Sequence, residues 1–172
     1  MSAEAVHPSG YDRLQSQVIP GYGSLARLAV ALLSCSPQAQ QQGSSVLVAG
    51  CGTGAELLEA VAQRPDWQLT ALDPSDEMLS ASRERLAGAP SIRWHQDTVE
   101  DFVAGEAAAG GFSGALSVLV LQSLPDDGSK LAYLSALAKC LQSGAQLVLV
   151  DLMRSSLTSL EPQLEAAWEG FQ

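Results

Sequence analysis

The sequence predicts an α/β fold in which helices cover both faces of one parallel β-sheet. Short runs of apolar, often β-branched residues alternate with longer segments whose apolar residues recur at helical spacing. Glycine, proline or aspartate follows most of the short runs, and a glycine-rich turn joins one of them to a helix. Strands that alternate with helices in this way form right-handed βαβ units, which build a parallel sheet.

The composition fits one folded domain and disfavours several classes of partner. The chain has 172 residues, of which 47% are hydrophobic and 16% charged, and its net charge is −10. A nucleic-acid binder normally presents a basic surface, so no nucleic-acid partner is expected. The sequence has neither a signal-peptide pattern nor an apolar run long enough for a membrane span. We therefore expect a cytoplasmic protein without a membrane partner.

The N-terminal part of the chain is predicted to contribute one helix. Residues 1–20 contain Pro8, Gly10 and Pro20, with Gly21 directly after them, and are predicted to be irregular. Residues 25–33 carry alanine and leucine at helical spacing, and Pro37 is expected to end that helix.

Residues 45–49 and the glycines that follow them predict a ligand-binding turn. The run is small, apolar and β-branched, which is typical of a strand buried on both faces. Gly50, Gly52 and Gly54 follow at alternate positions, before a helix. Glycine permits a sharp turn and a close approach of backbone to ligand, and a helix N-terminus offers free N–H groups. Because a tight turn needs one glycine rather than three, the spacing indicates a nucleotide-sized site.

The other strands and helices follow in alternating order. Further strands are predicted at residues 67–72, 92–96, 112–121 and 146–151. Helices are predicted between the glycine turn and Pro65, at residues 74–87 and 99–103, between Gly128 and Gly144, and at residues 162–168. The apolar stripe of the first of these helices is predicted at Leu57, Leu58 and Val61; that of the helix before Gly144 is predicted at Leu131, Leu134, Leu137, Ala138 and Leu141.

Polar residues follow the predicted strands at the edge where parallel sheets bind ligands. In open α/β sheets the ligand lies beyond the carboxyl ends of the strands, where the strand order reverses. Asp73 follows the second strand and can accept hydrogen bonds from both hydroxyls of a ribose. Asp97 and Thr98 follow the third, where a carboxylate can accept from the amine of adenine. Residues 121–125 follow the fourth and are expected next to the glycine turn.

This series of motifs resembles the class I S-adenosylmethionine-dependent methyltransferases over about residues 11–170. The resemblance implies a Rossmann-like sheet in the order 3-2-1-4-5. It implies one domain over residues 1–172, with an N-terminal lid or helix in residues 1–44 and the core in residues 45–172. It also implies S-adenosylmethionine as the cofactor and methyl transfer to a small-molecule acceptor, which the sequence does not identify. No catalytic residue is assigned.

A closer resemblance is to carboxy-S-adenosylmethionine synthase and its relatives. The pieces that carry it are Val18-Ile19-Pro20-Gly21-Tyr22, Gly50-Cys51 and Leu121-Gln122-Ser123-Leu124. In that group the tyrosine of the Pro-Gly-Tyr turn lies against the cofactor, which implies the same role for Tyr22. The cofactor contacts implied by the resemblances and the strand-end positions are Tyr22, Gly50, Cys51, Gly52, Gly54, Asp73, Pro74, Asp97, Thr98 and Leu121.

Several positions depart from the patterns of these families. Val118 stands where the synthase has an asparagine, and the synthase's cofactor-carboxylate arginine lies beyond the length of this chain, so methyl transfer is favoured over carboxyl transfer. Val48 replaces the acid common two places before the first glycine, so the amino group of the methionine part needs another acceptor. The usual last two strands are expected to be missing, as in a truncated domain or a shortened natural variant. An exposed fifth strand would then allow a homodimer.

Two other functions fit parts of the sequence. The glycine turn and Asp73 can be aligned with the dinucleotide pattern of an NAD-dependent oxidoreductase, although Gly54 and Asp97 suit S-adenosylmethionine better. A non-catalytic module that binds the cofactor or a partner is the other alternative, favoured by Val48, Val118 and the short chain. No cluster of histidine, cysteine and carboxylate has metal-ligand spacing, so no metal is expected.

Overall fold

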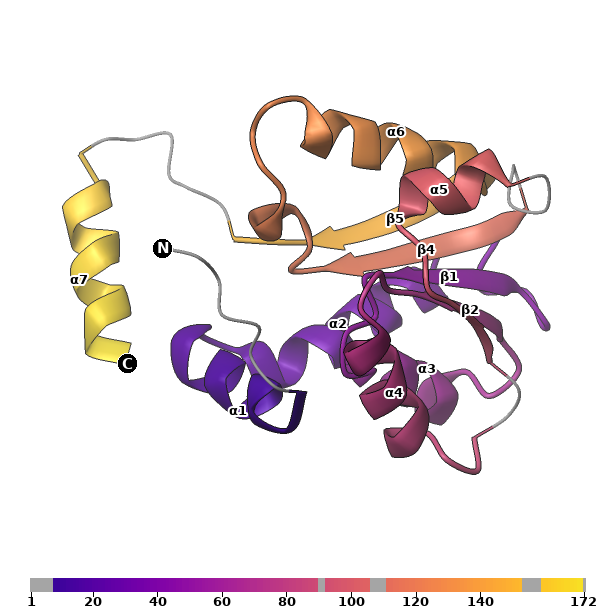
Figure 1. Ribbon diagram of the computed structural model, residues 1–172, viewed down its shortest axis with the longest axis horizontal. Coiled ribbons are helices and arrows are strands. Elements are labelled where there is room, and N and C mark those ends of the chain that lie inside the picture. The colour runs from indigo at the N-terminus through magenta and orange to yellow at the C-terminus, as the bar shows by residue number, and fades with distance from the viewer. Residues whose placement is uncertain (1–7, 90–91, 106–110, 153–158, 172) are drawn as a thin grey trace.

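A single parallel sheet organises the computed structural model, which describes residues 8–89, 92–105, 111–152 and 159–171 (Figure 1). Within these residues the sheet has five strands in the order β3-β2-β1-β4-β5, as predicted. The strands are β1 (Ser45–Ala49), β2 (Gln68–Leu72), β3 (Arg93–His95), β4 (Phe112–Val118) and β5 (Leu141–Val150). The strand order reverses between β1 and β4, which places the expected ligand crevice beyond the end of β1.

Helices cover both faces of the sheet, also as predicted (Figure 1). One face carries α2 (Tyr22–Ser34), α3 (Ala55–Gln63) and α4 (Asp76–Arg85); the other carries α5 (Val99–Ala104) and α6 (Ser129–Cys140). Successive side chains of β1 alternate between the two layers, so that Val46 and Val48 pack in one core and Leu47 and Ala49 in the other. All four are at most 1% exposed, which makes β1 the strand buried on both faces that its composition predicts.

The prediction that residues 1–20 are irregular is wrong for the described part of that segment. Residues 8–18 form the helix α1 (Pro8–Val18). Pro8 is its first residue, where the missing N–H of proline leaves no gap in the helix. The chain leaves the helix before Pro20 and Gly21, and the latter has a φ of 78°. Proline and glycine therefore bound this helix instead of preventing it.

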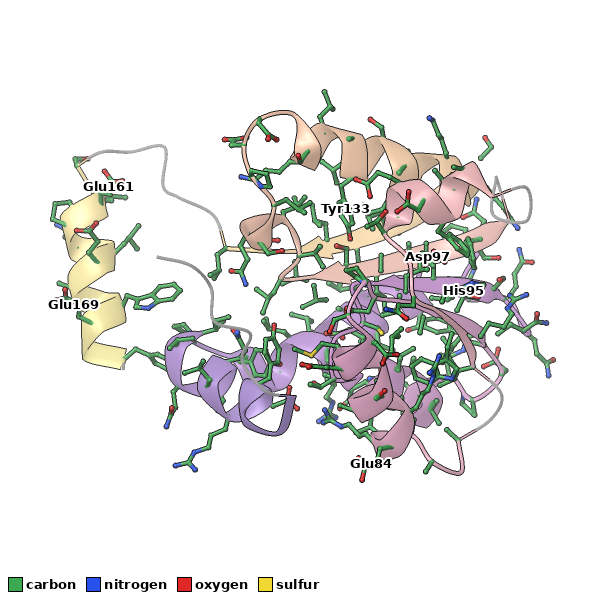
Figure 2. All side chains as sticks on the ribbon, viewed as in Figure 1. Glu84, His95, Asp97, Tyr133, Glu161 and Glu169 are labelled. Atoms are coloured by element: carbon green, nitrogen blue, oxygen red, sulfur yellow. The ribbon has the colours of Figure 1, made fainter. Side chains whose placement is uncertain are left out.

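The predicted apolar stripes of α3 and α6 are confirmed in part. Leu57 and Leu137 are fully buried, and Val61, Leu134 and Leu141 pack against the two core clusters. The other predicted members are exposed, and amphipathic side chains face inward beside the buried leucines. Leu58 of α3 is 42% exposed, whereas Glu56 is 9% exposed and faces inward. Leu131 of α6 is 70% exposed, whereas Tyr133 is 4% exposed and lies between α6 and the sheet (Figure 2). Both helices present amphipathic side chains to the interior, which a count of leucines does not detect.

The ends of β4 and β5 also differ from the prediction. β4 ends at Val118 because Leu119 has a left-handed backbone, with a φ of 59°, and a 3₁₀ turn, η1 (Leu121–Ser123), follows. β5 already begins at Leu141, directly after α6. Gly144, with a φ of 78°, therefore lies in the irregular first part of β5 and does not cap α6.

The last described helix, α7 (Glu161–Phe171), contacts α1 and lies away from the sheet (Figure 1). β5 is the last strand in the order, and none of its ten residues is buried in the described part of the chain. Among the described helices, none has the length and apolar character required to cross a membrane.

Candidate functional site

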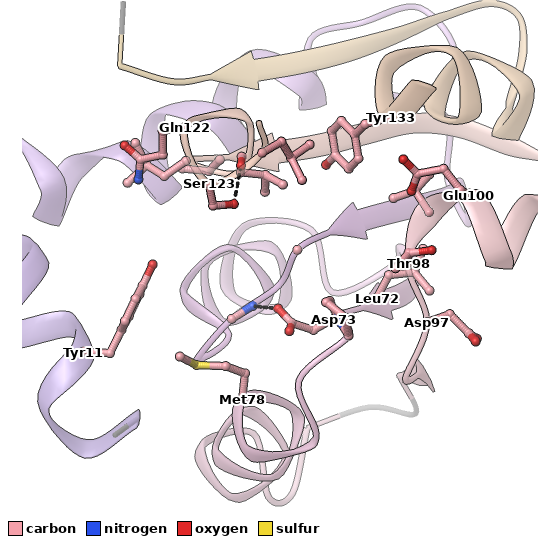
Figure 3. Close-up of a pocket in the computed structure, with 18 of the residues that line it drawn as sticks. Tyr11, Leu72, Asp73, Met78, Asp97, Thr98, Glu100, Gln122, Ser123 and Tyr133 are labelled. Atoms are coloured by element: carbon pink, nitrogen blue, oxygen red, sulfur yellow. Dashed lines mark hydrogen bonds between the residues drawn. The ribbon is translucent and has the colours of Figure 1, made fainter. Parts of the chain in front are cut away.

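A cavity of about 530 Å³ opens beyond the carboxyl ends of the central strands (Figure 3). A volume of this size is in the range of small-molecule and cofactor sites. It lies where the strand order reverses, as expected for an open α/β sheet. Of the ten predicted contact residues, six line this cavity: Gly50, Gly52, Asp73, Pro74, Asp97 and Thr98.

The glycine turn has a steric requirement at its first and last positions. Gly50 has a φ of 69°, and a Cβ there would lie 2.5 Å from Cγ2 of Val120 in the loop after β4. Gly54 begins α3 with a φ of 86°, and a Cβ there would collide with the hydroxyl of Ser82 on α4. Gly50 thus lets the two neighbouring loops approach each other, and Gly54 lets α3 pack against α4.

Asp73, at the end of β2, is a buried carboxylate that the backbone holds in place. Its Oδ2 accepts a hydrogen bond from the N–H of Gly52 at 2.8 Å (Figure 3). Its Oδ1 accepts one from the N–H of Ser75 at 2.9 Å. Burial raises the pKa of this carboxyl above its ordinary value, against the two backbone hydrogen bonds, which lower it. Each oxygen keeps further acceptor capacity for a ligand.

Asp97 and Thr98 line the cavity but are engaged by their own neighbours. The Asp97 carboxylate lies 4.0 Å from Nδ1 of His95 and points away from Asp73 in Figure 3. Thr98 caps α5: its Oγ1 accepts from the N–H of Asp101 at 3.1 Å and donates to Oδ2 of that residue at 2.8 Å. An adenine contact of the Asp97 carboxylate stays a prediction.

The remaining predicted contacts lie outside the main cavity. Tyr22 and Cys51 line a recess of about 30 Å³ that shares Gly50 and Gly52 with the cavity. Burial raises the pKa of the Cys51 thiol, so the thiol is neutral at ordinary pH and a poor nucleophile. Leu121 packs in the core cluster between the sheet and α6, and Gly54 acts through the turn.

α1 supplies one wall of the cavity, which the sequence prediction missed. Tyr11 and Gln15 lie four residues apart on one face of this helix and line the cavity, and Met78 of α4 lies near Tyr11 in Figure 3. Helical spacing of these two side chains was the available signal, but the prolines and glycines around them outweighed it.

A single carboxylate holds α1 over the glycine turn. Oδ1 of Asp12 accepts hydrogen bonds from Oγ1 of Thr53 at 2.7 Å and from the hydroxyl of Tyr22 at 3.0 Å. Its Oδ2 lies 2.8 Å from Nη1 of Arg85 on α4. Asp12 therefore joins α1 to the turn, to α2 and to α4.

The β4 side of the cavity is mainly apolar. Val118, Leu119 and Val120 line it, and Tyr133 reaches it from α6. The Tyr133 hydroxyl lies 2.8 Å from Oγ of Ser117, and burial raises its pKa to about 12. At neutral pH Tyr133 is thus a neutral hydroxyl and no base.

Glu56 is a second buried carboxyl near the turn, and sequence reasoning missed it. It lines the recess that contains Tyr22 and also a neighbouring hollow of about 280 Å³. Burial, together with the nearby Asp12 carboxylate, raises its pKa to about 7, although a hydrogen bond from its own backbone N–H and the charge of Arg85 lower it. Among the described residues, no side chain donates a hydrogen bond to the Glu56 carboxylate.

A family model described as a methyltransferase domain matches residues 47–147, which is more than half of the 172 residues. The match begins within β1 and includes the glycine turn, Asp73 and the loop after β4. A search of curated proteins finds no match.

Solved structures share this fold. DesVI from Streptomyces venezuelae is 25% identical, with a TM-score of 0.64 over 87% of this chain and 58% of its own. NodS, an N-methyltransferase from Bradyrhizobium japonicum WM9 in complex with S-adenosyl-L-homocysteine, is 20% identical, with a TM-score of 0.66 over 83% of this chain and 68% of its own. CalS10, an amino pentose methyltransferase from Micromonospora echinaspora with its cofactor bound, is 21% identical, with a TM-score of 0.63 over 84% and 55%.

This chain spans 58% of the length of DesVI and 55% of that of CalS10. The five-stranded parallel sheet is shared with these structures, and the family model covers the glycine turn. The chain therefore belongs to the methyltransferase domain family, in the class I group whose cofactor is S-adenosylmethionine.

Proposed function

We propose that the chain binds S-adenosylmethionine in the main cavity and transfers its methyl group to a small-molecule acceptor. The principal support is Asp73, a buried acid with fixed orientation and free acceptor capacity at the reversal of strand order. Vicinal ribose hydroxyls are donors that suit such a carboxylate. Residues 1–172 are proposed to act as one domain.

The proposed contacts fall into two groups. Pro74, Asp97 and Thr98 lie on the side of the cavity beyond β2 and β3, where they suit the adenosine part. Tyr22 and Cys51 line the recess on the other side of the glycine turn, where they suit the methionine part. Gly54 contributes through the shape of the turn, and a contact of Leu121 stays a prediction.

The chemistry requires positioning more than proton transfer. When bound, S-adenosylmethionine supplies a methyl group already activated by a sulfonium charge. The protein's contribution is to hold both partners in line and exclude water, which can be worth about 7–11 kcal/mol. Val118, Leu119 and Val120 provide an apolar wall for this purpose, and Tyr133 adds a neutral hydroxyl held by Ser117.

An amine is the acceptor group that we favour. NodS is described as an N-methyltransferase and CalS10 as an amino pentose methyltransferase. A net charge of −10 also favours the approach of cationic amines over anions. Membership of the carboxy-S-adenosylmethionine synthase group and a homodimer through β5 remain predictions from the sequence.

Calorimetry with S-adenosylmethionine tests the proposal. Asp73→Asn is expected to weaken binding about 10- to 100-fold, the loss for hydrogen bonds to a charged group. Glu84→Gln is the control, since Glu84 is an exposed acid on α4 that points away from the sheet (Figure 2). Equal affinity of the Asp73 variant and wild type would remove Asp73 from the site, and binding of NADH alone would indicate an oxidoreductase.

The proposed methyl transfer is tested with S-adenosylmethionine that carries a tritium-labelled methyl group and a panel of small amines as acceptors. A labelled product is expected with at least one amine, and Asp73→Asn should reduce its rate. Tight cofactor binding without transfer to any amine, alcohol or thiol in the panel would instead favour a non-catalytic cofactor-binding module.

A further inference from the structure

We propose that Glu56 accepts hydrogen bonds from the ammonium group of the methionine part of the cofactor. This inference rests on the proposed function and adds a contact residue to it. Glu56 is the second residue of α3, directly beyond the glycine turn. Most glutamates in the first turn of a helix are exposed to solvent, whereas Glu56 is buried.

The position of the recess connects Glu56 with the main cavity. Both spaces share Gly50, Gly52 and Leu119 in their linings, so they adjoin each other along the glycine turn. The recess measures about 30 Å³, close to the volume of one water molecule in the liquid. An ammonium group is of similar size, so the recess has room for this group but not for a nucleoside.

The electrostatics of the recess favour a cation. Glu56 is 9% exposed, and the Asp12 carboxylate adds negative charge nearby. Arg85 is the neighbouring cation, but its guanidinium is bound to Asp12 at 2.8 Å. A buried carboxylate without a cationic partner carries a large desolvation penalty, which a bound ammonium would offset. The raised pKa of Glu56, about 7, is consistent with a carboxyl that lacks such a partner.

The core packing explains why another residue must supply the acid. Val48 is 1% exposed and packs in the core cluster on the α3 side of the sheet, together with Leu57 and Ala60 of that helix. A valine cannot accept a hydrogen bond. Glu56 approaches the glycine turn from the helix on the same face as Val48, so it supplies a carboxylate close to the place where β1 does not.

Calorimetry with three probes at pH 8 separates this role from others. The probes are S-adenosylmethionine, S-adenosylhomocysteine, which lacks the sulfonium charge, and 5′-methylthioadenosine, which lacks the amino acid part. Glu56→Gln is expected to weaken the first two about 10- to 100-fold, as for one hydrogen bond between charged groups, and to leave the third unchanged. The control is Glu84→Gln, which should change none of the three affinities.

Three results would overturn the assignment. If only S-adenosylmethionine binds more weakly, Glu56 faces the sulfonium. If all three weaken equally, its role is structural; if none weakens, it has no role in binding. Failure of wild type to bind any probe would contradict the proposed function itself. If Glu56→Gln does not fold, Glu56→Met, of similar volume and without a hydrogen-bonding group, serves for the same comparison.

Discussion

Asp73 and Glu56 are both buried acids beside one glycine turn, yet the protein treats them differently. Asp73 lies on the β2 side and accepts hydrogen bonds from two backbone N–H groups. Glu56 lies on the α3 side, where its own backbone N–H donates to it and no side chain among the described residues does. Burial raises the pKa of both carboxyls, but at Asp73 two backbone hydrogen bonds oppose the rise, whereas the pKa of Glu56 reaches about 7. Burial is therefore common to the two acids, and the hydrogen-bond partners of each carboxylate distinguish them.

The largest effect on stability is expected at Asp73. Asp73→Ala leaves the N–H groups of Gly52 and Ser75 without their acceptor, and an unsatisfied buried donor costs about 1–3 kcal/mol each. We expect a loss of about 2–4 kcal/mol in the free energy of unfolding, measured in urea. A variant as stable as wild type would mean that water replaces both hydrogen bonds. The two backbone N–H groups would then not distinguish Asp73 from Glu56.

The opposite sign is expected at Glu56 in the absence of ligand. Its folded pKa of about 7 lies above the ordinary 4.5, so its contribution to stability is most favourable below pH 4.5 and is lost as the pH rises to about 7. Glu56→Gln removes this loss. The variant should therefore exceed wild type by up to about 3 kcal/mol at pH 8, since one pKa unit equals about 1.4 kcal/mol.

Urea unfolding of both proteins across this pH range measures the difference. The charged and titratable groups that face Glu56 are Asp12 on α1, Arg85 on α4, the Cys51 thiol of the glycine turn and the hydroxyls of Tyr11 and Tyr22. They are present in both proteins, so their contributions cancel to first order in the comparison. A variant that is less stable than wild type at pH 8 would show that the carboxylate already has a stabilising partner.

A smaller effect on stability is expected at Asp12, which joins α1 to the glycine turn, α2 and α4. Asp12→Ala removes the acceptor of Thr53 and Tyr22 and the partner of Arg85. Because these groups are partly exposed, water can replace Asp12, and we expect a loss of about 1–2 kcal/mol. Faster proteolysis within α1 should accompany it. Asp126→Ala is the control, since the side chain of Asp126 is 90% exposed in its pair with Lys130.

The sequence predicted those features of the site that local pattern determines. β1, the glycine turn and the position of Asp73 follow from apolar runs, glycine spacing and strand ends, and the sheet order follows from the resemblance that these motifs carry. The orientation of Glu56 and Tyr133 was not predictable in this way, because it depends on how α3 and α6 rotate when they pack on the sheet.

The wall of the cavity that α1 forms was missed for a related reason. The helix α1 is held by contacts of Asp12 with residues distant in sequence, including Thr53 and Arg85. Tertiary contacts of this kind outweigh weak helix propensity, and nothing in the first twenty residues records them. A helix made possible by its neighbours is therefore difficult to predict from its own sequence.

The left-handed backbone of Leu119 has a consequence for how this chain tolerates change. A non-glycine residue in this conformation costs about 1–2 kcal/mol, a strain that glycine would avoid. The side chain is only 8% exposed and forms part of the apolar wall beside the cavity. The least strained backbone and the complete apolar wall therefore require different amino acids at position 119, so a substitution that relieves the strain also removes part of the cavity's lining.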